Sequence, residues 1–206
     1  MTDMTNDAPG RLARPPFDPL TMLLHWAALL LVIGQFATAW SIDRVAPPMA
    51  VALLTVHRSA GVVLWTLMAL RLVWRITGMR IPPPPSGMTR WHIAGVHMSE
   101  YGLYALLLVQ PLTGMADTLF RGRAFNMFIW RVPAMLTRNR PYAGLAHTLH
   151  IYGAYLLAAA IAVHAIAALA HHFVLKDQVL VGMLPTGRRR SARSGRQTEI
   201  DPQPNS

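Results

Sequence analysis

Residues 144–174 read GLAHTLHIYGAYLLAAAIAVHAIAALAHHFV, and this stretch decides the fold of the chain. It holds no lysine, arginine, aspartate or glutamate, and at about 1.5 Å per residue it is long enough to cross about 30 Å of hydrocarbon as a helix. Three apolar stretches precede it, at 20–40, 49–74 and 96–116. Because a backbone in lipid must satisfy its polar groups within its own segment, each is expected to be helical. The sequence therefore predicts an all-α integral membrane protein, a four-helix bundle.

The composition agrees with a membrane protein. Charged residues make up 14% of the chain and apolar residues 53%, whereas a typical soluble domain is about 25% charged. The net charge of +10 would suit nucleic acid, but the arginines lie between and beyond the apolar stretches, so we expect membrane-flanking charge and no nucleic-acid partner. The chain has no cysteine, which excludes disulfides, thiolate zinc sites, iron–sulfur clusters and haem attached through C-x-x-C-H.

The chain is expected to have three parts. Residues 1–18 form a polar lead-in without the apolar region and small-residue cleavage site of a secretory signal peptide. Residues 19–185 form the transmembrane domain, with polar or proline-rich separators between its four spans. Residues 186–206 form a basic tail rich in Arg, Ser, Gly and Pro, which is expected to be disordered.

The distribution of lysine and arginine predicts the orientation in the membrane. With the N-terminus inside, eleven of these residues lie inside and six outside, which favours cytoplasmic N- and C-termini. The inside set is Arg11, Arg14, Arg75, Arg80, Arg90, Lys176, Arg188, Arg189, Arg190, Arg193 and Arg196. The outside set is Arg44 together with the five arginines of the loop between the third and fourth spans.

The loop predicted to lie outside is basic, although the positive-inside rule predicts few lysines and arginines on that side. One interpretation is that it attracts an anion, and the other is that it docks on lipid phosphates. The candidate anion-attracting residues are Arg121, Arg123, Arg131, Arg138 and Arg140.

Four histidines lie well inside the apolar spans, where ionisable residues are costly and usually functional. His150 and His164 are 14 residues apart in the fourth span, so they share one helix face to within about 40° and lie roughly 21 Å apart along the axis. With the predicted orientation, His25 lies at the inner depth of His164, and His57 lies at the outer depth of His150. Two depth-matched pairs of neutral imidazoles are what two bis-histidine haem b groups require.

Two other interpretations of these histidines remain open. A single membrane histidine can simply hydrogen-bond a neighbouring backbone carbonyl. Alternatively, the stripe formed by His147, His150, His164 and His171 could serve a haem-free transporter of zinc or copper ions. The spans carry few carboxylates, chiefly Glu100 and Asp117, which disfavours a cation pathway.

Several stretches resemble the bacterial cytochrome b561 family of di-haem b-type inner-membrane cytochromes. They are LTMLLHWAALLLVIG at 20–34, VHRSAGVVLWTLMALRLVWR at 56–75, PPPP at 82–85, HMSEYGLYALLLVQPLTG at 97–114 and HIYGAYLLAAAIAVHAIAALAHHFVLKDQVLVGMLP at 150–185. The resemblance implies two haem b groups, with His25 and His164 holding the inner iron and His57 and His150 the outer iron. The chain departs from the family pattern at Leu149, where Trp is common, and at Gly182, where Arg is common.

The resemblance also implies a function. Members of the family exchange electrons with the quinone pool of the bacterial inner membrane, and superoxide oxidation coupled to ubiquinone reduction is associated with them. We therefore expect a superoxide:ubiquinone oxidoreductase in contact with lipid, which takes electrons from a small anionic donor. The alternative is a cytochrome b subunit that relays electrons between quinol and a separate periplasmic redox protein. The sequence assigns no catalytic residue, no quinone site and no role to His97, His147, His171 or His172.

Overall fold

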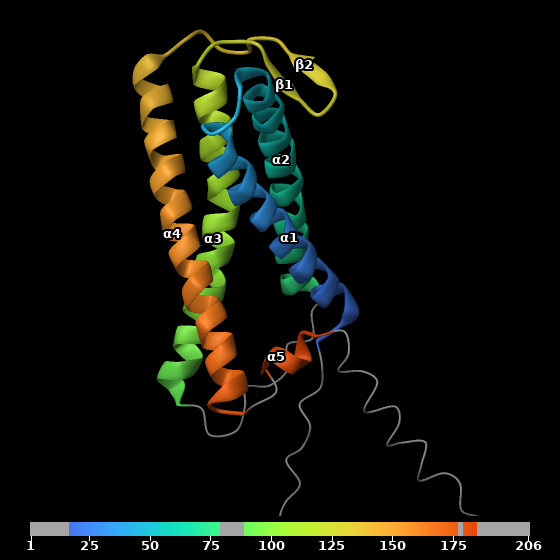
Figure 1. Cartoon of the computed structure of the whole chain (residues 1–206). Helices are drawn as coiled ribbons and strands as arrows, with labels where there is room; N and C mark the ends of the chain where they lie inside the picture. The colour runs from blue at the N-terminus through green and yellow to red at the C-terminus, as the bar shows by residue number, and fades with distance from the viewer. Residues whose placement is uncertain (1–16, 79–88, 177–178, 185–206) are drawn as a thin grey trace, which may run out of the picture.

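Four long helices dominate the computed structural model, which describes residues 17–78, 89–176 and 179–184. They are α1 (Pro19–Ile42), α2 (Pro47–Thr77), α3 (Arg90–Phe120) and α4 (Arg140–Phe173). All four are long and apolar enough to span a membrane. They lie side by side as an up-and-down bundle (Figure 1), and the predicted all-α membrane bundle is confirmed.

Local sequence explains where these helices begin. The side chains of Asp18, Thr89 and Asn139 precede α1, α3 and α4, and each accepts a hydrogen bond from a backbone N–H of the first turn. Such N-caps satisfy donors that a helix leaves free at its start. Proline occupies the first or second position of α1, α2 and α4, where its missing N–H costs nothing.

The helices pack as two antiparallel hairpins. Helix α1 lies along α2, α3 lies along α4, and α2 joins the hairpins through α3. The buried core between them includes Leu64, Met68, Tyr104, Leu107 and Leu157. Helix α4 combines the highest mean hydropathy, 2.0, with the smallest buried share, 6% of its most apolar window. In a membrane, lipid or an apolar prosthetic group covers exposed apolar helix surface of this kind.

A short β-hairpin closes one end of the bundle. Strands β1 (Phe125–Met127) and β2 (Trp130–Val132) pair antiparallel in the loop between α3 and α4. The hairpin is fastened to α2 by a hydrogen bond from the backbone N–H of Phe128 to the hydroxyl of Ser59, at 2.6 Å. We call this end of the bundle the hairpin end. The sequence had predicted only a loop here.

The opposite end is closed by the chain that follows α4. The short helix α5 (Val179–Gly182) turns back beneath α1 (Figure 1). The backbone N–H of Phe17 donates to Gly182, and the indole N–H of Trp26 donates to the carbonyl of Met183. We call this the α5 end.

Each of the four observed helices is longer than the span predicted for it. Helix α3 begins six residues before the predicted start at residue 96 and ends four residues after residue 116, whereas α4 ends at Phe173, one residue early. Arg75, which had been counted with the loop charges, lies inside α2. Residues 1–16 and 185–206, which include most of the predicted lead-in and the whole predicted tail, lie outside the described residues.

Candidate functional site: two histidine pairs and an arginine pocket

The structure brings the four predicted histidines together as two pairs. The ring centres of His57 and His150 lie 6.1 Å apart near the hairpin end, and those of His25 and His164 lie 6.5 Å apart nearer the α5 end. Two imidazoles on opposite sides of one metal ion have ring centres roughly 6 Å apart, because each metal–nitrogen bond is about 2 Å long. Both separations therefore fit an ion held between the rings.

These pairs also join helices that are not close neighbours. His25 lies on α1 and His57 on α2, whereas both of their partners lie on α4. Neither α1 nor α2 packs closely along α4 in the described structure. Each histidine pair therefore links α4 to a helix that it otherwise contacts little.

Hydrogen bonds orient the two rings nearest the hairpin end. The Thr38 hydroxyl lies 3.0 Å from Nδ1 of His57, and the Thr113 hydroxyl lies 3.1 Å from Nδ1 of His150. Both hydroxyls donate to backbone carbonyls of their own helices, so each oxygen is left to accept a hydrogen bond from the facing Nδ1–H. That arrangement favours the tautomer in which Nε2 carries the free lone pair, as a metal ligand needs.

The pair nearer the α5 end has a different surrounding. Nδ1 of His25 is shielded from solvent and has no hydrogen-bond partner among the described residues. The ring of His25 meets Trp26 edge-on, with centres 5.5 Å apart. The guanidinium of Arg71 is close enough to interact electrostatically with both His25 and His164.

Glycines create the space that the pair at the hairpin end occupies. A Cβ added at Gly114 would lie 2.8 Å from Cε1 of His150, which is closer than side chains tolerate. A Cβ at Gly61 would lie 3.1 Å from the amide nitrogen of Gln35, and that amide donates to the carbonyl of His57. Glycine at these positions lets side chains of a neighbouring helix approach the backbone closely.

The alternative of a haem-free metal site requires more ligands in one place. Among residues 17–78, 89–176 and 179–184, no group of three or more histidines, aspartates and glutamates is arranged to hold a metal ion. The stripe of His147, His150, His164 and His171 is therefore not gathered into one cluster in the described part of the chain.

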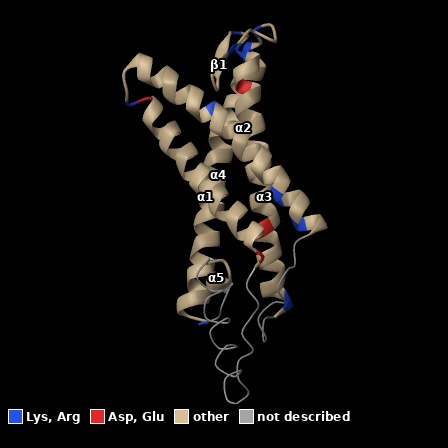
Figure 2. Cartoon of the chain, turned by 90° about the vertical axis from the view of Figure 1, so that its right-hand side faces the viewer, with Lys and Arg blue, Asp and Glu red and all other residues tan. Residues whose placement is uncertain are grey.

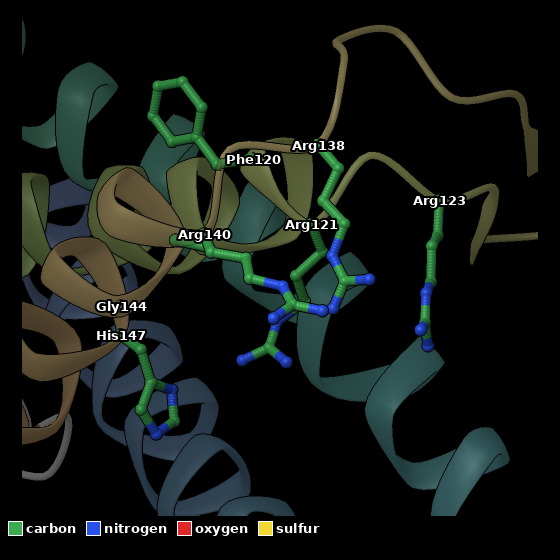
Figure 3. Close-up of a pocket in the computed structure, with 8 residues that line it drawn as sticks. Phe120, Arg121, Arg123, Arg138, Arg140, Gly144 and His147 are labelled. Carbon is green, nitrogen blue, oxygen red and sulfur yellow. The ribbon is translucent and has the colours of Figure 1, made fainter.

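The loop arginines form a pocket at the hairpin end. A cavity of about 340 Å³ is lined by four of the five predicted arginines and by Phe120, Ala143, Gly144 and His147. Arg121, Arg138 and Arg140 turn their guanidinium groups toward one another, and Arg123 stands farther out (Figure 3). The fifth predicted residue, Arg131, is exposed on β2 and does not line the pocket.

One carboxylate lies against this pocket. Asp117 accepts two hydrogen bonds from Arg121, both at 2.9 Å, and lies 3.3 Å from Nδ1 of His147. Arg123, Arg138 and Arg140 form no ion pair with any described residue. The pocket therefore keeps a surplus of positive charge beside His147, which lies one helical turn before His150.

Four further polar residues, Gln110, Glu100, His97 and His172, do not line this pocket. Gln110 donates to the carbonyl of His150 at 2.6 Å, so it supports the histidine pair. Glu100 forms an ion pair with Arg75 at 2.7 Å, and His97 lies 3.8 Å from the same carboxylate. His172 stacks edge-on against Phe173 at the end of α4.

Sequence reasoning missed Thr38, Thr113 and Gln35 as partners of the histidines. A signal for them exists, because Gln-x-x-Thr occurs at 35–38 in α1 and again at 110–113 in α3. In each copy the glutamine amide donates to the carbonyl of a histidine on the next helix, and the threonine faces Nδ1 of that histidine. The two helical hairpins thus repeat one arrangement.

Comparisons with known proteins identify the family. The family model for prokaryotic cytochrome b561 matches residues 16–186. Cytochrome b561 homolog 1 of Escherichia coli (strain K12) is 30% identical over 174 residues, which cover 82% of this chain and 97% of that protein. A probable superoxide oxidase, CybB, of Yersinia pestis is 32% identical over 172 residues, covering 80% of this chain and 93% of that protein. The chain therefore belongs to the prokaryotic cytochrome b561 family, whose members are haem b electron-transfer proteins of bacterial membranes.

Proposed function

We propose that the protein is a di-haem b cytochrome that oxidises superoxide at one membrane face and reduces ubiquinone in the bilayer. The observation that carries the proposal is the presence of two separate imidazole pairs, with ring centres 6.1 Å and 6.5 Å apart. His57 and His150 would hold one haem, and His25 and His164 the other. Haem iron, when bound, accepts and releases one electron at a time.

The protein's own residues prepare both sites. Thr38 and Thr113 would favour the tautomer of His57 and His150 in which Nδ1 carries the hydrogen and Nε2 is free to bind iron. Apolar side chains of the bundle core exclude water from the interior. Low polarity around a redox group affects its potential and limits side reactions with water.

The arginine pocket would receive the electron donor. Arg123, Arg138 and Arg140 present positive charge that no described carboxylate neutralises, so the pocket attracts a small anion such as superoxide. His147 lies in the pocket wall, one turn of α4 from His150, which places the anion close to the proposed ligand pair. The relationship to a probable superoxide oxidase supports this donor.

The orientation we propose places the hairpin end at the periplasmic face and both termini in the cytoplasm of a bacterial inner membrane. The positive-inside count supports this orientation. Arginines also gather around the hairpin, while most of the length of the helices carries neither sign of charge (Figure 2). The basic outer loop, unusual for a periplasmic segment, then has a function as the donor pocket.

The proposed reaction balances with ubiquinone as the acceptor. Two superoxide anions lose one electron each and become two molecules of dioxygen. Ubiquinone gains these two electrons and two protons and becomes ubiquinol. No group of the described structure is needed as an additional oxidant or reductant.

The experiment supplies superoxide to the purified holoprotein in vesicles that contain ubiquinone. We expect ubiquinol to form at one molecule per two superoxide anions, and superoxide dismutase to abolish its formation. If ubiquinol forms only when a periplasmic dehydrogenase or reductase is added, the chain is instead a relay subunit. A colourless preparation that takes up zinc or copper ions would overturn both assignments.

A further inference from the structure

Helix α2 carries an arginine at the level where α4 carries its second histidine. Arg71 follows His57 by 14 residues, as His164 follows His150. This spacing puts Arg71 on the face of His57 to within about 40° and roughly 21 Å farther along α2. The electrostatic interaction of Arg71 with both His25 and His164 agrees with that position.

Arg71 forms no ion pair with any carboxylate in the part of the chain that the structure describes. Its Nε is shielded from solvent and has no hydrogen-bond partner among the described residues. Its guanidinium carbon lies 5.6 Å from the centre of the Tyr104 ring, over the aromatic face. An unpaired charge in a membrane interior is costly.

The carboxylate that interacts with Arg71, that of Glu100, already forms an ion pair with another arginine. Arg75, one turn beyond Arg71, forms a 2.7 Å ion pair with Glu100, and its side chain is only 8% exposed. Two guanidinium groups therefore share one carboxylate, which leaves one positive charge unbalanced. The groups that surround it are His25 of α1, His164 of α4, and Tyr101, Tyr104 and Glu100 of α3.

The other arginine close to a histidine of the two pairs is in a different position. Arg58 donates from Nε to the hydroxyl of Thr118 at 3.2 Å and lies over the ring of Phe125 at 5.5 Å. Its electrostatic neighbours include Asp117. Asp117 and Glu100 are each already paired with another arginine. The difference between the two arginines is therefore that Nε of Arg58 has a hydrogen-bond partner, whereas Nε of Arg71 has none among the described residues.

We propose that Arg71 binds a propionate carboxylate of the haem held by His25 and His164. The proposal rests on the proposed function, because it needs a haem at that pair. A haem b group carries two propionates, and a guanidinium pairs with a carboxylate through two parallel hydrogen bonds. One propionate would neutralise the surplus charge of the cluster and fix the rotation of the porphyrin between α1 and α4.

The test is a redox titration of the purified holoprotein, followed by its visible absorption. Arg71→Gln removes one positive charge beside the inner haem, so that haem's midpoint potential should fall while the outer haem keeps its own. Arg71→Lys retains the charge and should restore the wild-type potential for the most part. Arg90→Gln removes the same charge from the exposed start of α3 and should leave both potentials unchanged.

The affected potential is assigned by comparison with His25→Ala protein, which should contain only the outer haem. Loss of the inner haem from Arg71→Gln, with recovery in Arg71→Lys, would also support the proposal. Two retained haems with unchanged potentials in Arg71→Gln, or equal shifts of both potentials, would overturn it. So would an inner haem that Arg71→Lys fails to recover in folded protein. Wild-type protein with no haem at His25 and His164 would instead contradict the proposed function itself.

Discussion

The hydroxyl oxygen of Thr38 lies 3.0 Å from Nδ1 of His57, and its single hydrogen is directed to backbone carbonyls within its own helix, which leaves the oxygen as the acceptor toward the ring. Nδ1 of His57 is therefore the donor, and Nε2 is the atom with a free lone pair. The same relationship recurs between Thr113 and His150. In both imidazoles of this pair, a threonine therefore favours the tautomer that a metal ligand would need.

Replacing Thr38 with valine should raise the midpoint potential of the outer haem. The hydrogen bond from Nδ1 to an oxygen makes the imidazole a stronger electron donor to the metal, and valine of similar shape removes it. We also expect haem affinity at that site to fall by roughly 10-fold or more. A redox titration and a haem count measure the two effects.

Thr66→Val is the matched control for this change. Thr66 is exposed on α2 and donates to the carbonyl of Val62 at 3.0 Å. It follows His57 by nine residues, which places it on the opposite face of the helix. Its replacement should alter neither potential. A Thr38→Val protein indistinguishable from the control would show that the hydroxyl does not act on the ligand.

Gly114→Ala should displace the ring of His150 and reduce occupancy of the outer haem, because the new Cβ would lie 2.8 Å from Cε1 of that ring. Gly102→Ala, in the same helix, has no atom within 4 Å of its added Cβ and should keep both haems. We expect the control to gain roughly 0.5–1 kcal/mol in stability, since alanine favours helix over glycine. Haem content and thermal unfolding in detergent separate the two variants.

The combined change Arg138→Gln and Arg140→Gln should slow reduction by superoxide about 10-fold or more at low salt, because steering by a charged pocket contributes 10–10³ to association rates. The control removes charge from the same loop outside the pocket, by Arg131→Gln. We expect little change from it. Stopped-flow rates at rising ionic strength should converge for the variant and the wild type, because salt screens the field. Equal losses in both proteins would mean that net charge, and not the pocket, governs the rate.

Asp18 should make the stability of α1 depend on pH. Burial raises the pKa of its carboxyl, but hydrogen bonds from the backbone and hydroxyl of Thr21 outweigh this and hold the pKa below its ordinary value of 3.8. The contribution of the cap is therefore complete above that ordinary value and is lost as the pH falls through the folded-state pKa.

Asp18→Ala should lower stability by about 1 kcal/mol at neutral pH, while Asp18→Asn keeps a capping oxygen and should lose much less. Thermal unfolding followed by circular dichroism in detergent checks both values. Acidification should narrow the difference between wild type and Asp18→Ala. A difference that stays constant at acidic pH would contradict the role of the ionised carboxylate.

The sequence was sufficient to predict the bundle and the pairing of the histidines. Apolar length determines where a helix can cross lipid, and the 14-residue spacing of His150 and His164 requires two levels on one face. The depths of His25 and His57 then follow from the alternating direction of the helices. These inferences use only helix geometry, which tertiary packing barely alters.

Helix geometry predicts neither the β-hairpin nor which of the loop arginines line the pocket. Strands of three residues, such as Phe125–Met127, give no alternation long enough to recognise. The position of Arg131 on β2, outside the pocket, depends on this hairpin. The contacts of Thr38 and Gln35 depend on how α1 and α2 are rotated against each other, although the repeated Gln-x-x-Thr pattern was present in the sequence.

A pyridine haemochrome assay of haem per chain, applied to paired histidine substitutions, tests the central claim most directly. We predict two haems in the wild type, one in each single alanine variant, and one in His57→Ala combined with His150→Ala. Combining His25→Ala with His57→Ala should leave none, because each change removes a different haem. One haem remaining in that cross-pair variant, or two in any folded single variant, would contradict the pairing.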